Sequence, residues 1–345
     1  MAVAGRPFTL GTANVAQAAL TAQAHELVER SALGPGLIRI PAGPAPEQAL
    51  LAVHTEAYLA RLRDACAGGP WDGEHAPVTP ATWEAATLTV GGALAAVDAV
   101  LDGRLPRALV HARPAGHHAE PDRAIASTYL NTVACAAEHA VARGAERIAI
   151  IDWDVHVGNG AERIFWERDD VLAISLHQRD WYPSHAGDVR ATGGPRAEGC
   201  TVNVPLPPAT TDAGYLLAFD EVVAPAVRAF RPDLILVAAG QDASVLDPTG
   251  RMLVSAGGFR ALAERAALLA DELTGGRLVA ATEGGYSPLY NPFCLLAVVE
   301  GLAGAGGGVP DPFLDDATVA AARAPAGPAL REAVAAARAA QPRWF

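Results

Sequence analysis

Two carboxylates and one imidazole occupy alternate positions in the segment Asp152-Trp153-Asp154-Val155-His156. The segment directly follows an apolar run at residues 148–151, which is typical of a buried strand. Because alternate side chains of an extended chain point to the same side, Asp154 and His156 can converge on one ion. Carboxylate oxygen and imidazole nitrogen are both zinc ligands in proteins. The spacing therefore predicts a metal site at the end of this strand.

A third ligand is expected after the apolar run at residues 234–238, where the segment 239–248 carries Asp247. Two carboxylates and one imidazole would leave a coordination position open for water, as catalytic zinc requires. The alternative is that each aspartate caps a helix or a turn, which is a common place for this residue type. The prediction of one zinc ion per chain therefore depends on the combination of all three residues.

Two adjacent histidines, His117 and His118, follow the apolar run at residues 108–110 and lie in a loop that contains Pro114 and Gly116. Imidazole titrates near neutral pH, so such a pair can act as general acid and general base. The competing interpretation is a pair of structural histidines at the surface or in the core.

A tyrosine follows a fourth apolar run, residues 278–281, in the segment Thr282-Glu283-Gly284-Gly285-Tyr286. The glycines permit close approach of the backbone, and the hydroxyl of Tyr286 can donate a hydrogen bond to a developing oxyanion. Each of these signals is moderate alone. Because they follow four separate strands, at places where side chains can meet, coincidence is a poor explanation.

The elements that must position these residues alternate along the chain. Apolar runs rich in Val, Ile and Leu predict strands at residues 108–110, 148–151, 171–176, 202–206, 234–238 and 278–281. Ala- and Leu-rich stretches of helical length lie at residues 82–101, 132–143, 213–230 and 258–273. This alternation predicts a three-layer α/β/α fold with a mainly parallel central sheet and a ligand site beyond the carboxyl ends of the strands. We expect one catalytic domain over residues 1–345, with a C-terminal helix from about residue 315 packing on it.

Composition narrows the class of function. The chain has 345 residues, of which 51% are hydrophobic and 19% charged, so it can bury a large core. Its formal net charge of −12 disfavours nucleic-acid binding, which needs clustered basic side chains. The N-terminus lacks a signal-peptide pattern, and no apolar run is expected to span a bilayer, so we expect a cytoplasmic protein without a membrane partner. The sequence leaves the oligomeric state open, and a homo-oligomer is compatible with it.

The ordered motifs resemble the histone deacetylase superfamily, which has the arginase/deacetylase fold. They are most similar to its bacterial class II branch, near the acetylpolyamine amidohydrolases. The resemblance runs from about residue 45 to residue 305. It rests on the motifs RPAGHHA at 113–119, DWDVH at 152–156, DP at 247–248 and EGGY at 283–286.

The resemblance implies a role for each motif. The implied zinc ligands are Asp154, His156 and Asp247. The residues implied to act in catalysis are His117, His118, Tyr286, Asp152 and Asn159. In this assignment His118 is the main general base and acid, Asp152 supports His117, Asn159 orients His118, and Tyr286 polarises the substrate carbonyl. A structural potassium ion is also implied, held by Asp152, by Ser175 and Leu176, and by backbone oxygens of Asp154 and His156.

The implied reaction is hydrolysis of an acyl amide by metal-activated water, on a substrate such as acyl-lysine, an acetylpolyamine or a bulkier small-molecule amide. The residues implied to face the substrate are Gly116, Ser127, Tyr182 and Gly285. The chain has Ala126-Ser127-Thr128 where the family usually has Gly-Phe-Cys. Because that phenylalanine forms one wall of a narrow acyl tunnel, Ser127 predicts a wider and more polar one.

Two other functions remain open from the sequence. A manganese ureohydrolase would share the fold but would need further metal carboxylates in the motifs that here carry the histidine pair and Tyr286. A catalytically idle relative that binds acyl groups would have no need to keep the ligands and Tyr286 together.

Overall fold

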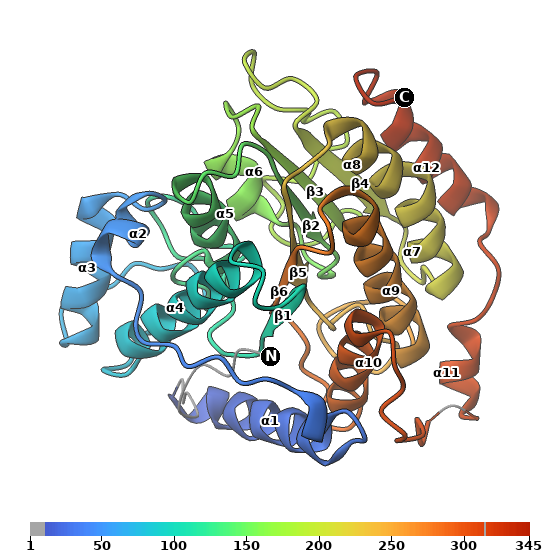
Figure 1. Ribbon diagram of the computed structural model, residues 1–345, viewed down its shortest axis with the longest axis horizontal. Helices are drawn as coiled ribbons and strands as arrows, with labels where there is room; N and C mark the ends of the chain where they lie inside the picture. The colour runs from blue at the N-terminus through green and yellow to red at the C-terminus, as the bar shows by residue number, and fades with distance from the viewer. Residues whose placement is uncertain (1–10, 314) are drawn as a thin grey trace.

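Six short apolar segments form one sheet within residues 11–313 and 315–345, which the computed structural model describes (Figure 1). The strands are β1 (Arg107–Val110), β2 (Ile148–Asp152), β3 (Val171–Gln178), β4 (Thr201–Leu206), β5 (Leu234–Ala239) and β6 (Leu278–Thr282). All the pairings between them are parallel. The six predicted strands are therefore confirmed, with ends that differ by one or two residues.

Each strand is buried on both faces, because alternate residues enter two different hydrophobic cores. In β2, Ile148 and Ile150 belong to one core, whereas Ala149 and Ile151 belong to the other. This explains why the strands are continuous apolar runs in the sequence and do not alternate with polar residues.

Helices cover both faces of the sheet and give the predicted three layers (Figure 1). The core on the first face takes residues from α2 (Glu47–Leu51), α3 (Glu56–Cys66), α4 (Thr82–Leu101), α5 (Thr132–Ala142) and α6 (Asn159–Ile164). The core on the second face takes residues from α1 (Gly11–Arg30), α7 (Asp212–Ala218), α8 (Ala224–Phe230), α9 (Ala256–Leu273), α10 (Asn291–Ala303) and α12 (Pro328–Ala339). The remaining short helices are η1 (Gly34–Gly36), η2 (Phe219–Val223) and α11 (Ala317–Ala321).

Two helical predictions need correction. The stretch 213–230 is interrupted by the π-helical turn η2 between α7 and α8. Pro225 explains the interruption, since proline has no N–H to donate and its ring collides with the carbonyl one turn earlier. The C-terminal segment forms the two helices α11 and α12. Of these, α12 packs against β4 and buries Leu330 and Val334.

Among the described residues, helix α4 is long and apolar enough, by length and composition alone, to cross a membrane. It has 20 residues, but 67% of its most apolar 18-residue stretch is buried inside the protein. It packs against α5 and β1. These contacts identify it as a core helix.

The order of strands in the sheet is β1-β6-β5-β2-β3-β4. From β2 the chain continues to β3 on one side, and it later returns to place β5 on the other side of β2. The carboxyl ends of β2 and β5 therefore flank the point where the winding direction reverses. Open parallel sheets usually bind their ligands in the crevice at such a point.

Candidate active site

Three side chains with metal-ligand chemistry meet at the carboxyl ends of β2 and β5. Nδ1 of His156 lies 3.0 Å from Asp154 Oδ1 and 3.0 Å from Asp242 Oδ2. One ligand atom from each of the three residues lies within 4.8 Å of the other two. Asp154 and Asp242 are buried, whereas His156 is partly exposed. Two carboxylates and one imidazole at this spacing fit one divalent ion with a coordination position left open.

The sequence pattern points to Asp247 as the third ligand, but Asp242 is the carboxylate that lies beside Asp154 and His156, so the geometry favours Asp242 as the third candidate ligand. Asp247 Oδ1 accepts hydrogen bonds from the backbone N–H and the hydroxyl of Thr249, at 2.9 and 2.6 Å. Its Oδ2 accepts from the backbone N–H groups of Tyr286 and Ser287, at 2.6 and 3.2 Å. Both oxygens are therefore used to shape loops. Asp242 lies closer to the end of β5, so the strand-end rule itself favours it.

Two glycines leave the space that the carboxylates occupy. A Cβ atom on Gly284 would collide with Asp242 Oδ2 and lie 2.7 Å from Asp154 Oδ2. A Cβ atom on Gly240 would collide with Asp154 Oδ2. The N–H of Gly284 also donates to Asp154 Oδ2 at 2.7 Å, and the N–H of Val155 donates to Asp242 Oδ1 at 2.9 Å. The backbone thus holds both carboxylates in one orientation.

The electrostatics of this group favour a bound cation. Burial alone lowers the pKa of His156, but Asp242 and Asp154 reverse the effect and raise it to about 10. Burial, together with the negative charge of Asp154, raises the pKa of Asp242 to about 7. Two buried carboxylates therefore face a single imidazole. A divalent ion would balance their negative charges better than one proton does.

The two adjacent histidines have different hydrogen-bond partners. Nδ1 of His117 lies 2.9 Å from Asp152 Oδ2, and Nδ1 of His118 lies 2.6 Å from Asn159 Oδ1. Their rings are 4.0 Å apart, and the His118 ring is 5.7 Å from that of His156. Both predicted partners, Asp152 and Asn159, are thus brought to the histidines assigned to them.

These partners move the pKa values of the two histidines in opposite directions. Burial opposes a charge on His117, but Asp154 and Asp152 outweigh burial and raise its pKa well above the usual value. Burial lowers the pKa of His118, and the positive charges of His117 and His156 lower it further. The pair thus offers one protonated and one neutral imidazole, which are an acid and a base.

Glu283 fixes the loop that carries the histidine pair, a role that the sequence analysis missed although the residue belongs to the EGGY motif. Its Oε2 accepts hydrogen bonds from the backbone N–H groups of Gly116 and His117, at 2.7 and 3.0 Å. Gly116 has no room for a side chain, because a Cβ atom would lie 2.5 Å from Thr132 N. The structure thus gives Gly116 a packing role, and contact with substrate remains a prediction.

Tyr286 follows β6 and lies beside the metal-ligand group. Burial raises the pKa of its hydroxyl, and Asp242 and Asp154 are close enough to add to this rise. Arg113 donates from Nη2 to Gly285 O at 3.1 Å, and its Cζ lies 5.3 Å from the centre of the Tyr286 ring. Gly285 has φ +132°, which favours glycine. The hydroxyl therefore stays protonated at neutral pH and can donate a hydrogen bond.

Tyr182 lies beside two histidines of the site, and its contact with substrate remains a prediction. Its ring is edge-on to His118 at 5.5 Å and to His156 at 6.2 Å. Its hydroxyl donates to Glu74 Oε1 at 3.2 Å, and the ring of His75 lies 6.5 Å away. Neither Glu74 nor His75 belongs to a sequence motif, so no local pattern identifies them as part of the site.

Ser127 lies in the same neighbourhood, because its hydroxyl donates to His75 O at 3.1 Å. The side chain of Trp181, the residue before Tyr182, points toward a different loop. Its Nε1 donates to Thr249 O at 3.0 Å, and Arg251 lies over its ring. Trp181 is thus engaged with a different loop.

The residues expected to hold potassium come from two adjacent strands. Asp152 of β2 is paired in register with Ser175 of β3, and Leu176 is the next residue. Asp152 Oδ1 accepts from the N–H of Asp154 at 3.0 Å, and Ser175 Oγ accepts from the N–H of Gly158 at 3.2 Å. These residues are close together, and the ion itself remains a prediction.

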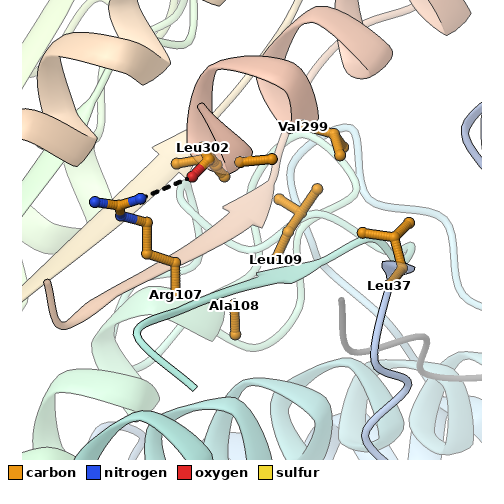
Figure 2. Close-up of a pocket in the computed structure, with 7 residues that line it drawn as sticks. Leu37, Arg107, Ala108, Leu109, Val299 and Leu302 are labelled. Carbon is orange, nitrogen blue, oxygen red and sulfur yellow. Dashed lines mark hydrogen bonds between the residues drawn. The ribbon is translucent and has the colours of Figure 1, made fainter. Parts of the chain in front are cut away.

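A separate apolar cavity of about 100 Å³ lies at the start of β1 (Figure 2). It is lined by Leu37, Leu109, Val299 and Leu302, and Arg107 Nη1 donates to Leu302 O there at 3.1 Å. The metal-ligand group lies at the carboxyl ends of the strands, so this cavity is no part of the candidate active site.

Known proteins that are similar to this chain are named as deacetylases or amidohydrolases. The Histone deacetylase domain matches residues 14–302. The histone deacetylase-like amidohydrolase of Pseudomonas aeruginosa is 45% identical over 79% of this chain and 73% of its own length. A probable deacetylase of Archaeoglobus fulgidus is 40% identical over 74% of this chain and 71% of its own length. The crystal structure of the HDA15 HD domain covers 95% of this chain and 89% of that chain, with a TM-score of 0.83 and 28% identity.

These matches extend over most of the chain, and the domain match at residues 14–302 includes the strands, the histidine pair and the metal-ligand group. They also confirm the arginase/deacetylase-like fold class. The protein belongs to the histone deacetylase family.

Proposed function

We propose that this chain is a zinc-dependent amidohydrolase that removes an acyl group from a linear amide. The observation that carries the proposal is the meeting of Asp154, His156 and Asp242 beside a histidine pair whose pKa values move in opposite directions. The comparisons support hydrolase chemistry of the deacetylase type, since two relatives are named a histone deacetylase-like amidohydrolase and a probable deacetylase.

The residues that would hold zinc are Asp154, His156 and Asp242. The buried carboxylates and the glycines that make room for them fit such an ion. When bound, zinc lowers the pKa of a coordinated water to roughly 7 and polarises a carbonyl group. A structural potassium ion between β2 and β3 is part of the same proposal.

The histidine pair would move the protons. The neutral His118 takes a proton from the attacking water, because its Nδ1 is hydrogen-bonded to Asn159 and its Nε2 is then free to accept. The departing amine needs a proton in return. Either His118, once protonated, or His117, whose pKa Asp154 and Asp152 raise, supplies it.

Tyr286 would stabilise the negative charge that develops on the substrate oxygen. Its raised pKa keeps the hydroxyl protonated, so that it donates a hydrogen bond to that oxygen. Glu283 keeps the histidine loop in place during this step.

The substrate would enter past Tyr182, Ser127 and His75. A serine hydroxyl in place of a ring leaves one wall of this entrance small and polar, so we propose that the enzyme accepts amides bulkier than acetyl-lysine. The polar contact of Ser127 with His75 O supports a wall without an apolar gripping surface.

A turnover assay on purified protein tests the proposal. Protein stripped of metal and reloaded with zinc or with manganese is offered acetyl-lysine peptide, acetylpolyamine, larger acyl amides and a guanidinium substrate. We expect amide hydrolysis with zinc and no urea from the guanidinium substrate. Urea release with manganese would support a ureohydrolase instead, and binding of acyl groups without turnover would support an idle relative.

A further inference from the structure

Glu120 is a buried carboxylate behind His118 that the proposed mechanism does not use. It follows the motif at 113–119 directly and has 1% exposure. Its Oε1 accepts a hydrogen bond from Asn159 Nδ2 at 2.9 Å. Asn159 in turn holds His118 through Oδ1, at 2.6 Å from the histidine Nδ1. A continuous chain of contacts thus joins Glu120 to the proposed base.

The Glu120 carboxylate remains ionised because basic groups surround its other side. Arg123 donates to both oxygens at 2.9 and 3.0 Å, Arg163 Nε lies 3.2 Å from Oε2, and His185 Nε2 lies 2.9 Å from Oε1. Burial alone raises the pKa of Glu120, but the hydrogen bonds from Arg123, His185 and Asn159 hold it below its usual value. An ionised carboxylate can only accept hydrogen bonds.

This property determines which way the Asn159 amide points. Asn159 Nδ2 donates to Glu120 Oε1 and to the backbone oxygen of His118, at 2.9 and 3.1 Å. Neither oxygen can donate, so only the amide nitrogen fits between them. The amide oxygen must then face His118 Nδ1, which therefore carries a hydrogen. His118 Nε2 is left with a free electron pair.

We propose that Glu120 is a positioning residue that selects the base-competent tautomer of His118 by locking the amide orientation of Asn159. The inference rests on the proposed function, since it concerns the histidine assigned as the base. It also explains why a buried charge stands behind the site. A neutral residue could fill the same space, but it could not exclude the flipped amide.

Glu120→Gln tests this with little change in shape. If the introduced glutamine turns its nitrogen toward Asn159, the asparagine flips and presents an N–H to His118. If it turns its oxygen there, its nitrogen faces Arg163 and Arg123, which can only donate. In both arrangements the amide of Asn159 is held less firmly in one orientation. We expect kcat to fall about tenfold or more, as for other residues that orient a catalytic or metal-bound group, with KM changing less than about threefold.

Exchanging the carboxylate and the amide between positions 120 and 159 tests whether activity can be restored. In Asn159→Asp, two carboxylates face each other and activity should fall. In Glu120→Gln/Asn159→Asp, the new amide nitrogen donates to the new carboxylate, whose other oxygen accepts from His118 Nδ1. The double variant should therefore be several-fold more active than either single variant. Arg163→Gln is the control, because it removes an outer contact of Glu120 and leaves the contact with Asn159, so its kcat should stay within about twofold of the parent.

A second readout does not depend on turnover. Nitrogen NMR of the zinc-loaded, histidine-labelled protein distinguishes the two tautomers, and His118→Gln identifies the signal. We expect hydrogen on Nδ1 in the parent and a mixture or the other tautomer in Glu120→Gln. The proposal is overturned if an active parent and Glu120→Gln share the same kcat and tautomer, or if Arg163→Gln loses as much kcat as Glu120→Gln. An inactive parent with the expected tautomers would reject the proposed function and leave the role of Glu120 standing.

Discussion

Asp247 Oδ2 accepts the backbone N–H of Tyr286 at 2.6 Å, so the aspartate after β5 holds the loop after β6. We expect Asp242→Ala to lose most zinc and all activity, because it removes a proposed ligand. Asp247→Ala should keep zinc and lower kcat about tenfold or more, because only the support of Tyr286 is lost. Zinc content after dialysis, measured beside turnover, separates the two. Metal loss in Asp247→Ala together with metal retention in Asp242→Ala would restore the original assignment.

Tyr286→Phe should bind zinc and substrate normally and lose about a hundredfold in kcat. The reason is that its hydroxyl would act on charge that exists mainly in the transition state, where one donor is typically worth that much. Steady-state kinetics, with zinc analysis as the control, provide the check. A raised KM at unchanged kcat would make Tyr286 a binding residue.

Ser127→Phe should narrow the entrance. Acetyl-lysine peptide should be hydrolysed better and bulky amides worse, by an amount of about 1–3 kcal/mol in relative kcat/KM that is typical of pocket complementarity. The test is kcat/KM for paired small and bulky substrates in parent and variant. Equal selectivity in both proteins would show that position 127 does not set the width.

Acid should destabilise the fold through His54. Burial is the main cause that lowers its pKa to about 4 from the usual 6.5, and the hydrogen bond with Glu120 O opposes it. Its Nε2 accepts from the N–H of Asn131 at 3.0 Å, so a proton there would face another donor. The unfolded chain therefore binds the proton more readily between pH 6.5 and 4. Stability should fall as the pH drops through that window, by at most about 3 kcal/mol for this group.

Urea unfolding of the parent and of His54→Gln at several pH values between neutral and about 5 measures this effect. The difference in unfolding free energy between the two proteins should shrink as the pH falls, because only the parent loses the His54 contribution. Other buried histidines such as His111, whose pKa is also about 4, contribute to both proteins equally. A difference that does not change with pH would contradict the assignment.

The strands were predictable from the sequence because burial on both faces leaves an unbroken apolar run. The residues directly after them were predictable for a related reason, since parallel strands bring their carboxyl ends to one edge. Asp154, His156 and the histidine pair were found in this way. The structure differs from the prediction where one segment holds two aspartates, because it brings Asp242 and not Asp247 to Asp154 and His156. The choice between Asp242 and Asp247 depends on how the loop turns after β5, and local spacing does not encode that turn.

Contacts between distant segments were also beyond the sequence. Glu283 and Glu120 stand in or next to recognised motifs, but their partners become visible only when the loops are folded together. His75 and Glu74 lie outside every motif, and only the position of Tyr182 connects them with the site.

The strand order has a consequence for how the protein is made. β1 pairs only with β6 among the described strands, although residues 111–277 separate the two in the chain. Strand β1, which leads into the histidine loop, therefore has no strand to pair with during synthesis until residue 282 has left the ribosome. Contacts this distant in sequence are also slow to form. We expect nascent chains that end before β6 to leave β1 unpaired, so that the histidine loop reaches its final position late in the synthesis of this protein.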